Sequence, residues 1–358
     1  MLRAATNRLS LVELTPIDPN TSTMLEHLEY LKYCQPRTFE LLDKGVMADI
    51  PAIGGRANRL KEIRGHSDFN EDERGAAYRA RQLAVPRARE YGDRRIFAEL
   101  AQRLGGFSFK QVGLDVIGGN GTTARNAANL LPFRAAPHII AGDPCLDMVN
   151  DALSRNLPAV WQCAQETLFV DESLDFVIGS RGFHHVSSGA RPAAFAEAWR
   201  ILKRRGVFLV VDFEEGSPTA RWYSEGLDRY TRTGHRFAHF RRDGFVSLLT
   251  EAGFKDVDVF GLYDPFRFWA ETAEGARNAL LEHLVGMFGM VKLQREPSET
   301  ECAYWARIDR TIAPWCTFAA GEVAFDPEAL PRLSVFQEED GQWRAEFPRV
   351  ALCAVGVK

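Results

Sequence analysis

A glycine-rich turn between an apolar run and a helical segment constrains the fold of this chain most. The turn is Asp115-Val-Ile-Gly-Gly-Asn-Gly121; it follows the apolar residues 111–115 and opens into the helix-like residues 122–128. This order predicts strand, tight turn and helix, in which glycines let the backbone approach a ligand and the helix presents free N–H groups towards it. A nucleotide-like cofactor is the leading interpretation. Short glycine motifs also arise from packing alone, and residues 119–124 fit the dinucleotide pattern G-x-G-x-x-G/A as well.

Further apolar runs follow the turn at regular intervals. The run 137–143 ends in Asp143, where an α/β nucleotide site places the carboxylate that hydrogen-bonds ribose hydroxyls. Other strand-like runs are 159–163, 174–180 and 207–212, and an amphipathic helix is expected between the last two, over 193–203. Alternating strands and helices predict a parallel sheet with crossover helices.

The order and spacing of these pieces, over roughly residues 95–262, resemble the class I S-adenosylmethionine-dependent methyltransferases, and the small-molecule branch most of all. The resemblance rests on Leu114–Gly121, Gly142-Asp143, Val170–Ser180, His184-His-Val186, Trp199–Asp212 and Glu251-Ala-Gly-Phe254. It does not clearly extend to the first ninety residues or to most of the chain after 262. The implied fold is α/β, a Rossmann-like class I methyltransferase sheet with an N-terminal helical lid and an insertion before the last strand.

The resemblance also implies roles for individual residues. The glycine turn would lie under the methionine and ribose portions of S-adenosylmethionine, Asp143 would bind both ribose hydroxyls, and the end of the fourth strand would lie beside the sulfonium. The residues expected to bind the cofactor are Asp115, Gly118, Gly119, Gly121, Asp143, Cys163, Ala164, Gln165, Ser180 and Arg181.

Two positions depart from the family pattern. Ile117 stands where a glycine is usual, and a β-branched side chain there implies an ordinary extended backbone or a shifted loop. Cys163 stands where an acid usually precedes Ala164, and a thiol is a poor acceptor for the adenine amino group. Gln165 or Glu166 is expected to replace that acid.

The chain of 358 residues is longer than one minimal domain, so additions to the core are expected. The predicted parts are an N-terminal helical cap (1–92), the α/β core (93–262), a substrate-pocket or dimerisation insertion (263–345) and the last core strand (346–358). Within the insertion, the aromatic segments 266–269 and 303–305 are predicted to be helical. The cap and the insertion are expected to close over the cofactor.

Charge and cysteine content limit the partners. The net charge of −4 gives no overall basic field, so neither nucleic acid nor a membrane is an expected partner, and a small molecule is the expected substrate. A cytoplasmic location and a homodimer are further expectations. The six cysteines are scattered without a C-x-x-C pair, which supports neither a disulfide framework nor a structural zinc site, and no metal is predicted.

Catalytic residues are harder to select than cofactor residues. Methyl transfer is an in-line displacement that depends on positioning, and a base is needed only for a protonated acceptor. Histidine titrates in the right range. The candidates are His184, His185, His239 and Tyr223. Each also has a purely structural interpretation, since His185 and His239 can hold their loops and Tyr223 can be a packing residue.

Three other functions remain open at this stage. A nicotinamide-dependent oxidoreductase would use the same glycines and Asp143. An enzyme that transfers the aminocarboxypropyl group of S-adenosylmethionine, or cyclises it, would release methylthioadenosine. A non-catalytic relative would explain the altered motif. The sequence does not distinguish an oxygen, nitrogen or carbon acceptor.

Overall fold

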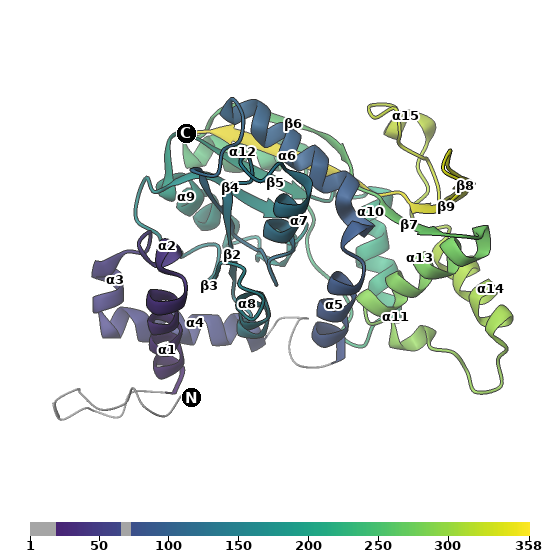
Figure 1. The fold of residues 1–358 in the computed structure, drawn as a ribbon, viewed down its shortest axis with the longest axis horizontal. Coiled ribbons are helices and arrows are strands. Elements are labelled where there is room, and N and C mark those ends of the chain that lie inside the picture. The colour runs from purple at the N-terminus through teal and green to yellow at the C-terminus, as the bar shows by residue number, and fades with distance from the viewer. Residues whose placement is uncertain (1–18, 66–72) are drawn as a thin grey trace.

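The computed structural model describes residues 19–65 and 73–358. Its centre is a seven-stranded sheet with the order β3-β2-β1-β4-β5-β10-β6 (Figure 1). The strands are β1 (Val112–Asp115), β2 (His138–Asp143), β3 (Ala159–Trp161), β4 (Leu174–Ser180), β5 (Leu202–Asp212), β6 (Lys255–Tyr263) and β10 (Val350–Val357). Strands β1 to β5 pair in parallel, whereas β10 runs antiparallel between β5 and β6. The sheet confirms the predicted Rossmann-like fold and the return of the last strand.

Helices cover both faces of this sheet. They are α6 (Glu90–Leu104), α7 (Thr122–Leu130), α8 (Leu146–Leu153), α9 (Arg191–Ile201) and α12 (Arg242–Ala252). Side chains of a strand alternate between faces, so Leu209 and Val211 of β5 pack with α6 and α7, while Phe208 and Val210 pack with α9 and α12. Burial on both faces explains why β5 is apolar from residue 206 onward instead of alternating.

The N-terminal helices form two groups. Helices α1 (Pro19–Cys34), α2 (Pro36–Phe39), α3 (Lys44–Ala48) and α4 (Ile50–Gly65) lie beside the β3 edge, where the Trp161 N–H donates to Nε2 of His27 at 3.0 Å. Helix α5 (Glu73–Ala84) instead packs against α13 (Ala273–Met287), with an ion pair from Arg81 to Glu282 at 2.8 Å. Helix α6 crosses the predicted boundary between residues 92 and 93. Residues 1–18 and 66–72 of the predicted cap lie outside the described residues.

The segment between β6 and β10 contains its own three-stranded sheet, β7-β9-β8. Its elements are β7 (Phe266–Ala270), α13, α14 (Glu301–Ile312), α15 (Ala320–Val323), β8 (Ser334–Gln337) and β9 (Trp343–Phe347). The predicted helix at 303–305 is confirmed as part of α14. The predicted helix at 266–269 is wrong, because this segment is strand β7. Its pairing with β9, in which Phe266 lies opposite Phe347, determines its conformation.

Short helical turns complete the fold. They are η1 (Pro86–Arg89), η2 (Phe183–His185), α10 (Pro218–Arg221), the π-helical η3 (Trp222–Leu227), α11 (Asp228–Tyr230) and η4 (Val291–Leu293). Within the described ranges, no helix combines the length and the apolarity needed to cross a membrane.

Candidate active site

Two aspartates end neighbouring parallel strands and lie at the same edge of the sheet. Asp115 ends β1 and is only 2% exposed, and burial raises the pKa of its carboxyl group to about 6. Its Oδ1 has no hydrogen-bond partner among the described residues. A buried carboxylate oxygen without a donor is costly unless a ligand supplies one, so Asp115 points to a bound polar group.

Asp143, at the end of β2, is held in one orientation by two backbone donors. Its Oδ2 accepts the Gly119 N–H at 3.0 Å, and its Oδ1 accepts the Cys145 N–H at 2.8 Å. Burial raises the pKa of Asp143 to about 7, although these two hydrogen bonds act in the opposite direction. A carboxylate has about four acceptor positions, so both oxygens retain room for hydroxyl donors.

Gly119 and Gly121, in the turn between β1 and α7, have different surroundings, although the sequence predicted that both contact the cofactor. Gly119 has φ +54°, and a Cβ added there would meet nothing within 4 Å, so this side of the turn is open for a ligand. Gly121 has φ +78° and precedes α7, but a Cβ there would approach Leu157 to 2.9 Å. Gly121 is therefore required by backbone conformation and packing. Gly118 is equally confined, with a β2 side chain 2.8 Å from its added Cβ, and Ile117 does not have a positive φ.

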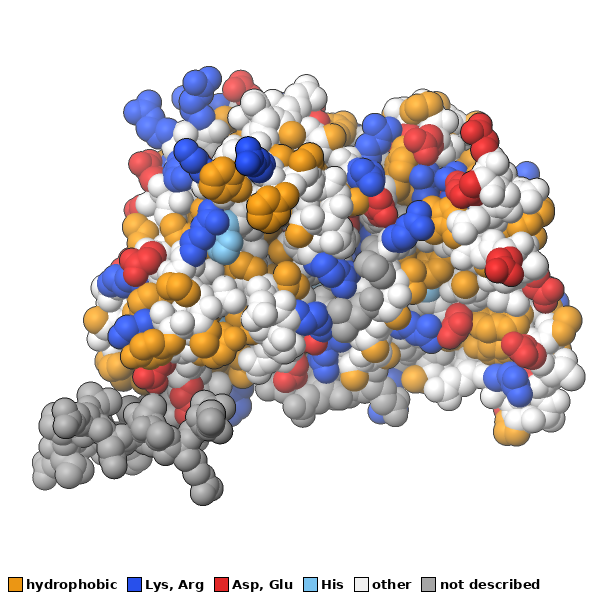
Figure 2. Space-filling view, in the orientation of Figure 1, with side chains coloured by type: hydrophobic (Ala, Val, Ile, Leu, Met, Phe, Trp, Pro, Cys, Tyr) orange, Lys and Arg blue, Asp and Glu red, His pale blue; other side chains and the backbone are white. Residues whose placement is uncertain are grey.

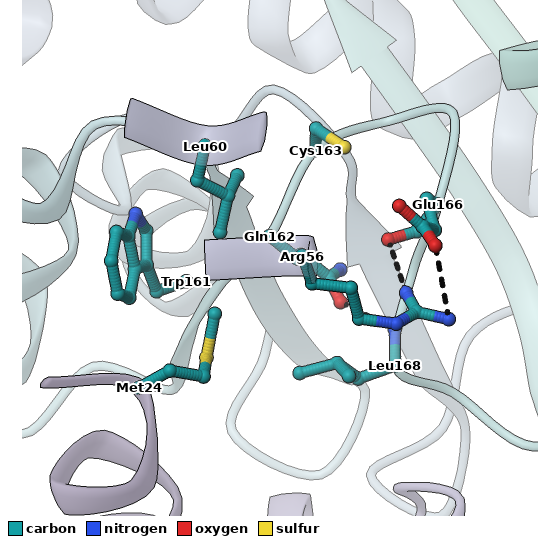
Figure 3. A pocket seen from close by; sticks show the side chains of 8 residues that line it. All are labelled: Met24, Arg56, Leu60, Trp161, Gln162, Cys163, Glu166 and Leu168. Atoms are coloured by element: carbon teal, nitrogen blue, oxygen red, sulfur yellow. Dashed lines mark hydrogen bonds and ion pairs between the residues drawn. The ribbon is translucent and has the colours of Figure 1, made fainter. Parts of the chain in front are cut away.

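A small pocket lies on the β3 side of this edge (Figure 3). Helices α1 and α4 contribute to it together with the loop after β3. The lining residues are Met24, Arg56, Leu60, Trp161, Gln162, Cys163, Glu166 and Leu168. Cys163 lines this pocket and is buried, as is the next residue, Ala164, and burial raises the pKa of the Cys163 thiol to about 11.

The expected substitutes for the missing acid differ in their surroundings. The Glu166 carboxylate accepts two hydrogen bonds from Arg59, at 2.7 and 2.6 Å, and forms an ion pair with Arg56 at 3.6 Å. It is therefore engaged by α4, while Gln165 is half-buried. Gln162 was not predicted as a site residue. Its Oε1 accepts the Leu168 N–H at 2.9 Å, and its buried Nε2 has no partner among the described residues. That amide is a donor suited to a ring nitrogen of adenine.

At the end of β4, Ser180 and Arg181 lie in different surroundings. The Ser180 hydroxyl is buried without a hydrogen-bond partner in the described part of the chain. Arg181, at φ +62°, donates to Asp93 at 2.7 Å and to Asp264 at 2.8 and 2.6 Å. Asp264 also accepts from Nη2 of Arg349 at 2.5 Å. We call Asp93, Arg181, Asp264 and Arg349 the arginine–aspartate network.

This network is fully enclosed. The side chains of Arg349 and Asp264 are both 0% exposed. Burial alone would raise the pKa of Asp264, but Arg181 and Arg349 outweigh it and the net direction is downward. The guanidinium of Arg181 therefore binds a carboxylate of α6 and one of the β6–β7 connection, and it joins these two elements at the site.

Four histidines gather next to the network, around the ends of β4 and β5. His184 and His185 belong to η2, and His235 and His239 lie on the returning segment 231–240; with Asp212 at the end of β5 they form the histidine cluster. The ring of His184 lies 4.3 Å from that of His185, 5.2 Å from that of His235 and 5.4 Å from that of His239. The pair His184 and His185 lies about fifty residues before the pair His235 and His239 in the sequence.

Asp212 fixes the orientation of His184. Both carboxylate oxygens of Asp212 approach Nδ1 of His184, at 2.8 and 3.0 Å, and Oδ2 also accepts the His184 N–H at 2.8 Å. Burial would raise the pKa of Asp212, but His184 outweighs it and the net direction is downward. Nδ1 faces the carboxylate, and Nε2 of His184 is buried without a partner in the described residues; in the neutral imidazole that donates from Nδ1, Nε2 is the nitrogen with the lone pair.

Two of the other three catalytic candidates, His239 and Tyr223, are less suited to proton transfer. Burial lowers the pKa of His239 to about 4, so its imidazole is neutral and weakly basic near pH 7. Tyr223 is stacked on Phe213 at 4.5 Å, its hydroxyl accepts from Nη1 of Arg349 at 3.2 Å, and burial raises its pKa. The structure thus brings all four candidates together but gives His184 the free, oriented nitrogen.

Comparison with known proteins agrees with this geometry. Residues 114–206, from β1 to the start of β5, match the family model described as a methyltransferase domain. No curated protein matches the chain. Among solved structures, the chain is similar to YcgJ of Bacillus subtilis, at 17% identity and a TM-score of 0.42, over 72% of this chain and 98% of that chain.

Two further solved structures show the same level of similarity. Phosphoethanolamine N-methyltransferase 2 of Haemonchus contortus, solved with S-adenosylhomocysteine, has 18% identity and a TM-score of 0.42, over 74% of this chain and 52% of that chain. A methyltransferase of Archaeoglobus fulgidus has 15% identity and a TM-score of 0.40, over 74% and 94% of the two chains. At these TM-scores the similarity identifies no substrate.

Residues 114–206 thus match a methyltransferase domain, in agreement with the resemblance predicted from the sequence. S-adenosylmethionine is the cofactor of such domains, and the residues at the sheet edge fit it. Asp143 keeps acceptor positions for hydroxyl donors, Gly119 leaves open space beside the turn, and Asp115, Gln162 and Ser180 each have a buried polar atom without a partner among the described residues.

Proposed function

We propose that the protein methylates a small molecule that binds between the cofactor edge and the histidine cluster. The observation that carries this proposal is the position of the His184–Asp212 pair, because it lies at the same edge of the sheet as Asp115 and Asp143. Gly182 connects the two halves, since a Cβ there would lie 3.2 Å from Ile117 of the glycine turn. S-adenosylmethionine, when bound, supplies the methyl group.

The residues of the cofactor half bind and orient. We propose that Asp143 accepts both ribose hydroxyls, that Asp115 accepts a donor through its free Oδ1, and that Gln162 donates to the adenine. We propose that Cys163 lines the adenine pocket and that the buried Ala164 lies beside it. Preorganised contacts of this kind hold the reacting carbon in line with the acceptor, which is the main source of rate in a displacement reaction.

On the acceptor side, Nε2 of His184 has the geometry of a general base. Asp212 holds the ring and stabilises the positive charge that forms when the ring takes up a proton. Tyr223 and Arg349 connect the histidine cluster to the insertion, because Tyr223 also packs against Phe288 at the end of α13, with ring centroids 5.6 Å apart. The insertion thus forms a wall of the acceptor side.

The burial of His184, Asp212 and His235 on the acceptor side supports a small molecule over a polymer. On the face shown in Figure 2, Lys and Arg side chains are interspersed with acidic and hydrophobic ones and form no continuous basic tract. The net charge of −4 agrees, because nucleic-acid binding depends on many basic contacts. A cytoplasmic location and a homodimer stay predictions.

The test is to follow a labelled methyl group. The protein is incubated with methyl-labelled S-adenosylmethionine and a whole-cell extract, and the label is separated into acid-soluble and acid-precipitable fractions. Label in acid-soluble products, with S-adenosylhomocysteine as by-product, supports the proposal. Label only in precipitated protein or nucleic acid would refute the small-molecule acceptor, and methylthioadenosine as by-product would show aminocarboxypropyl chemistry instead.

The cofactor half has its own test, Asp143→Ala. Hydrogen bonds to a charged acceptor contribute about 1.5–3 kcal/mol each, so the loss of the ribose contacts should weaken S-adenosylhomocysteine binding at least tenfold. Isothermal titration calorimetry measures this directly. Asp340→Ala, an exposed carboxylate in the turn between β8 and β9, is the matched control and should bind like the wild type. Equal affinities of the two variants would contradict the assignment of Asp143.

A further inference from the structure

We propose that the histidine cluster binds one divalent transition-metal ion of the zinc class through His184, His185 and His235. Nothing in the sequence pattern indicates this site, because its ligands come from two loops about fifty residues apart. The matched domain ends at residue 206, so His184 and His185 lie within it and His235 lies outside it.

The positions of the three imidazoles support the proposal. One ring nitrogen from each of His184, His185 and His235 lies within 4.8 Å of those of the other two. Nitrogens around a tetrahedral zinc ion at 2.0–2.1 Å are about 3.4 Å apart, so the rings need to close by no more than about 1.5 Å. Rotations of side chains achieve shifts of this size. Three imidazoles are also a donor set that zinc and related ions prefer.

Hydrogen bonding prepares His184 as a ligand. A metal-bound histidine usually donates its second ring N–H to a carboxylate, which fixes the tautomer and makes the ligand more basic. Nδ1 of His184 lies 2.8 Å from Oδ1 of Asp212, and Nε2 is buried without a partner among the described residues. The side chain of His184 is 1% exposed, so solvent does not satisfy this nitrogen.

A second set of ligands, His184, Asp212 and His239, has equally close atoms. The hydrogen bonds of Asp212 exclude it. Oδ1 accepts from Nδ1 of His184 and from the Phe213 N–H at 2.7 Å, and Oδ2 accepts from the His184 N–H and lies 3.0 Å from Nδ1. The acceptor positions of this carboxylate are therefore filled, and Asp212 supports His184 from behind instead of binding the ion.

Three protein ligands leave one position of a tetrahedral ion open, which is the pattern of catalytic zinc sites. His184 and His235 are each 2% exposed, whereas His185 is half-buried, so the open position faces the side of His185. Resting on the proposed function, this position would receive an oxygen or nitrogen atom of the acceptor and favour its deprotonated form, while His184, the base of the metal-free protein, would act as a ligand.

Metal binding can be measured without any acceptor. The purified protein is treated with a chelator, dialysed, and titrated with zinc chloride by calorimetry; cobalt chloride, followed by its visible absorption, reports the geometry. His185→Ala is the first variant, because this half-buried side chain is least needed for folding. His235→Ala is the second. His138→Ala, which removes a half-buried imidazole from β2 outside the cluster, is the matched control.

We expect one zinc ion per wild-type chain, affinity at least tenfold weaker in His185→Ala and His235→Ala, and unchanged affinity in His138→Ala. Asp212→Asn should weaken binding 10- to 100-fold, as the loss of a supporting carboxylate does. Wild-type affinity no higher than that of the double variant His185→Ala/His235→Ala would overturn the proposal. Titration of the same samples with S-adenosylhomocysteine separates the two proposals. If the protein binds S-adenosylhomocysteine but no zinc, the metal site is contradicted and the proposed function is not.

Discussion

The arginine–aspartate network predicts a large loss of stability when one carboxylate is neutralised. Asp264→Asn keeps the size of the side chain but removes the negative charge between two guanidinium groups. Asp264 accepts from Arg181 at 2.8 and 2.6 Å and from Arg349 at 2.5 Å. Arg181 would keep Asp93, whereas Arg349, which is 0% exposed, would lose its carboxylate partner and stay a buried cation.

The magnitude follows from this burial. Removing one partner of a buried ion pair costs about 3–5 kcal/mol, because the remaining charge is desolvated without compensation. An entropy of unfolding near 2.1 cal/mol/K per residue gives about 0.75 kcal/mol/K for 358 residues. The expected decrease in melting temperature is therefore about 4–7 °C. The ring of Phe266, 3.8 Å from the Arg349 guanidinium, offsets part of the cost and favours the lower end of this range.

Differential scanning calorimetry of the unliganded protein measures the effect. Asp243→Asn is the matched control, because Asp243 accepts two hydrogen bonds from Arg241 at 2.9 Å but both side chains are 70% exposed. An exposed pair contributes little, so the control should melt within about 1 °C of the wild type. If Asp264→Asn melts as close to the wild type as the control does, the network is not the buried ion-pair system described here.

Three further predictions concern the cofactor edge. Asp143 accepts hydroxyl donors in its ionised form, and its pKa is about 7 in the unliganded protein. The affinity for S-adenosylhomocysteine should therefore rise from pH 5.5 to pH 8, by up to about thirtyfold. Calorimetry that shows a flat or opposite pH dependence would contradict this. Gly119→Ala should lower the rise in melting temperature that the cofactor causes. Gly121→Val should lower the melting temperature of the unliganded protein through contact with Leu157. A full cofactor effect in Gly119→Ala would show that the turn is not at the ligand. Hydrogen exchange should slow in helices α1 to α5 and in residues 263–345 when S-adenosylhomocysteine binds, because both additions are expected to cover the site; protection confined to residues 115–185 would refute the lid.

The sheet could be predicted because residues close together in the sequence identify each of its strands. The parallel strands are buried on both faces and therefore appear as continuous apolar runs, and three of them, β1, β2 and β5, end at an aspartate. Asp115 and Asp143 could be located from this pattern alone. The different roles of Gly119 and Gly121 could not, because Leu157, which confines Gly121, lies 36 residues further along the chain.

The insertion and the histidine cluster depend on contacts between distant segments. Three aromatic residues in Phe266–Trp269 suit either a helix or a strand, and only pairing with residues 343–347 decides between them. Likewise, His235 reaches His184 because the chain returns along β5, where the Phe240 N–H donates to the Phe213 carbonyl at 3.1 Å. The loop 231–240 has no sequence signal for that return.

The position of β10 has a consequence for how the protein is made. This strand pairs with β5 through residues 352–357 and with β6 through residues 350–357, so β5 and β6 have no contact as neighbours without it. On the ribosome, β10 is synthesised after the other six strands. Until it emerges, the nascent chain carries two unpaired strand edges, of which that of β5 is apolar, and the sheet cannot be completed before nearly all of the described residues have been translated. Chaperone binding during synthesis is therefore expected to concentrate on the interval between the appearance of β5 and the arrival of β10.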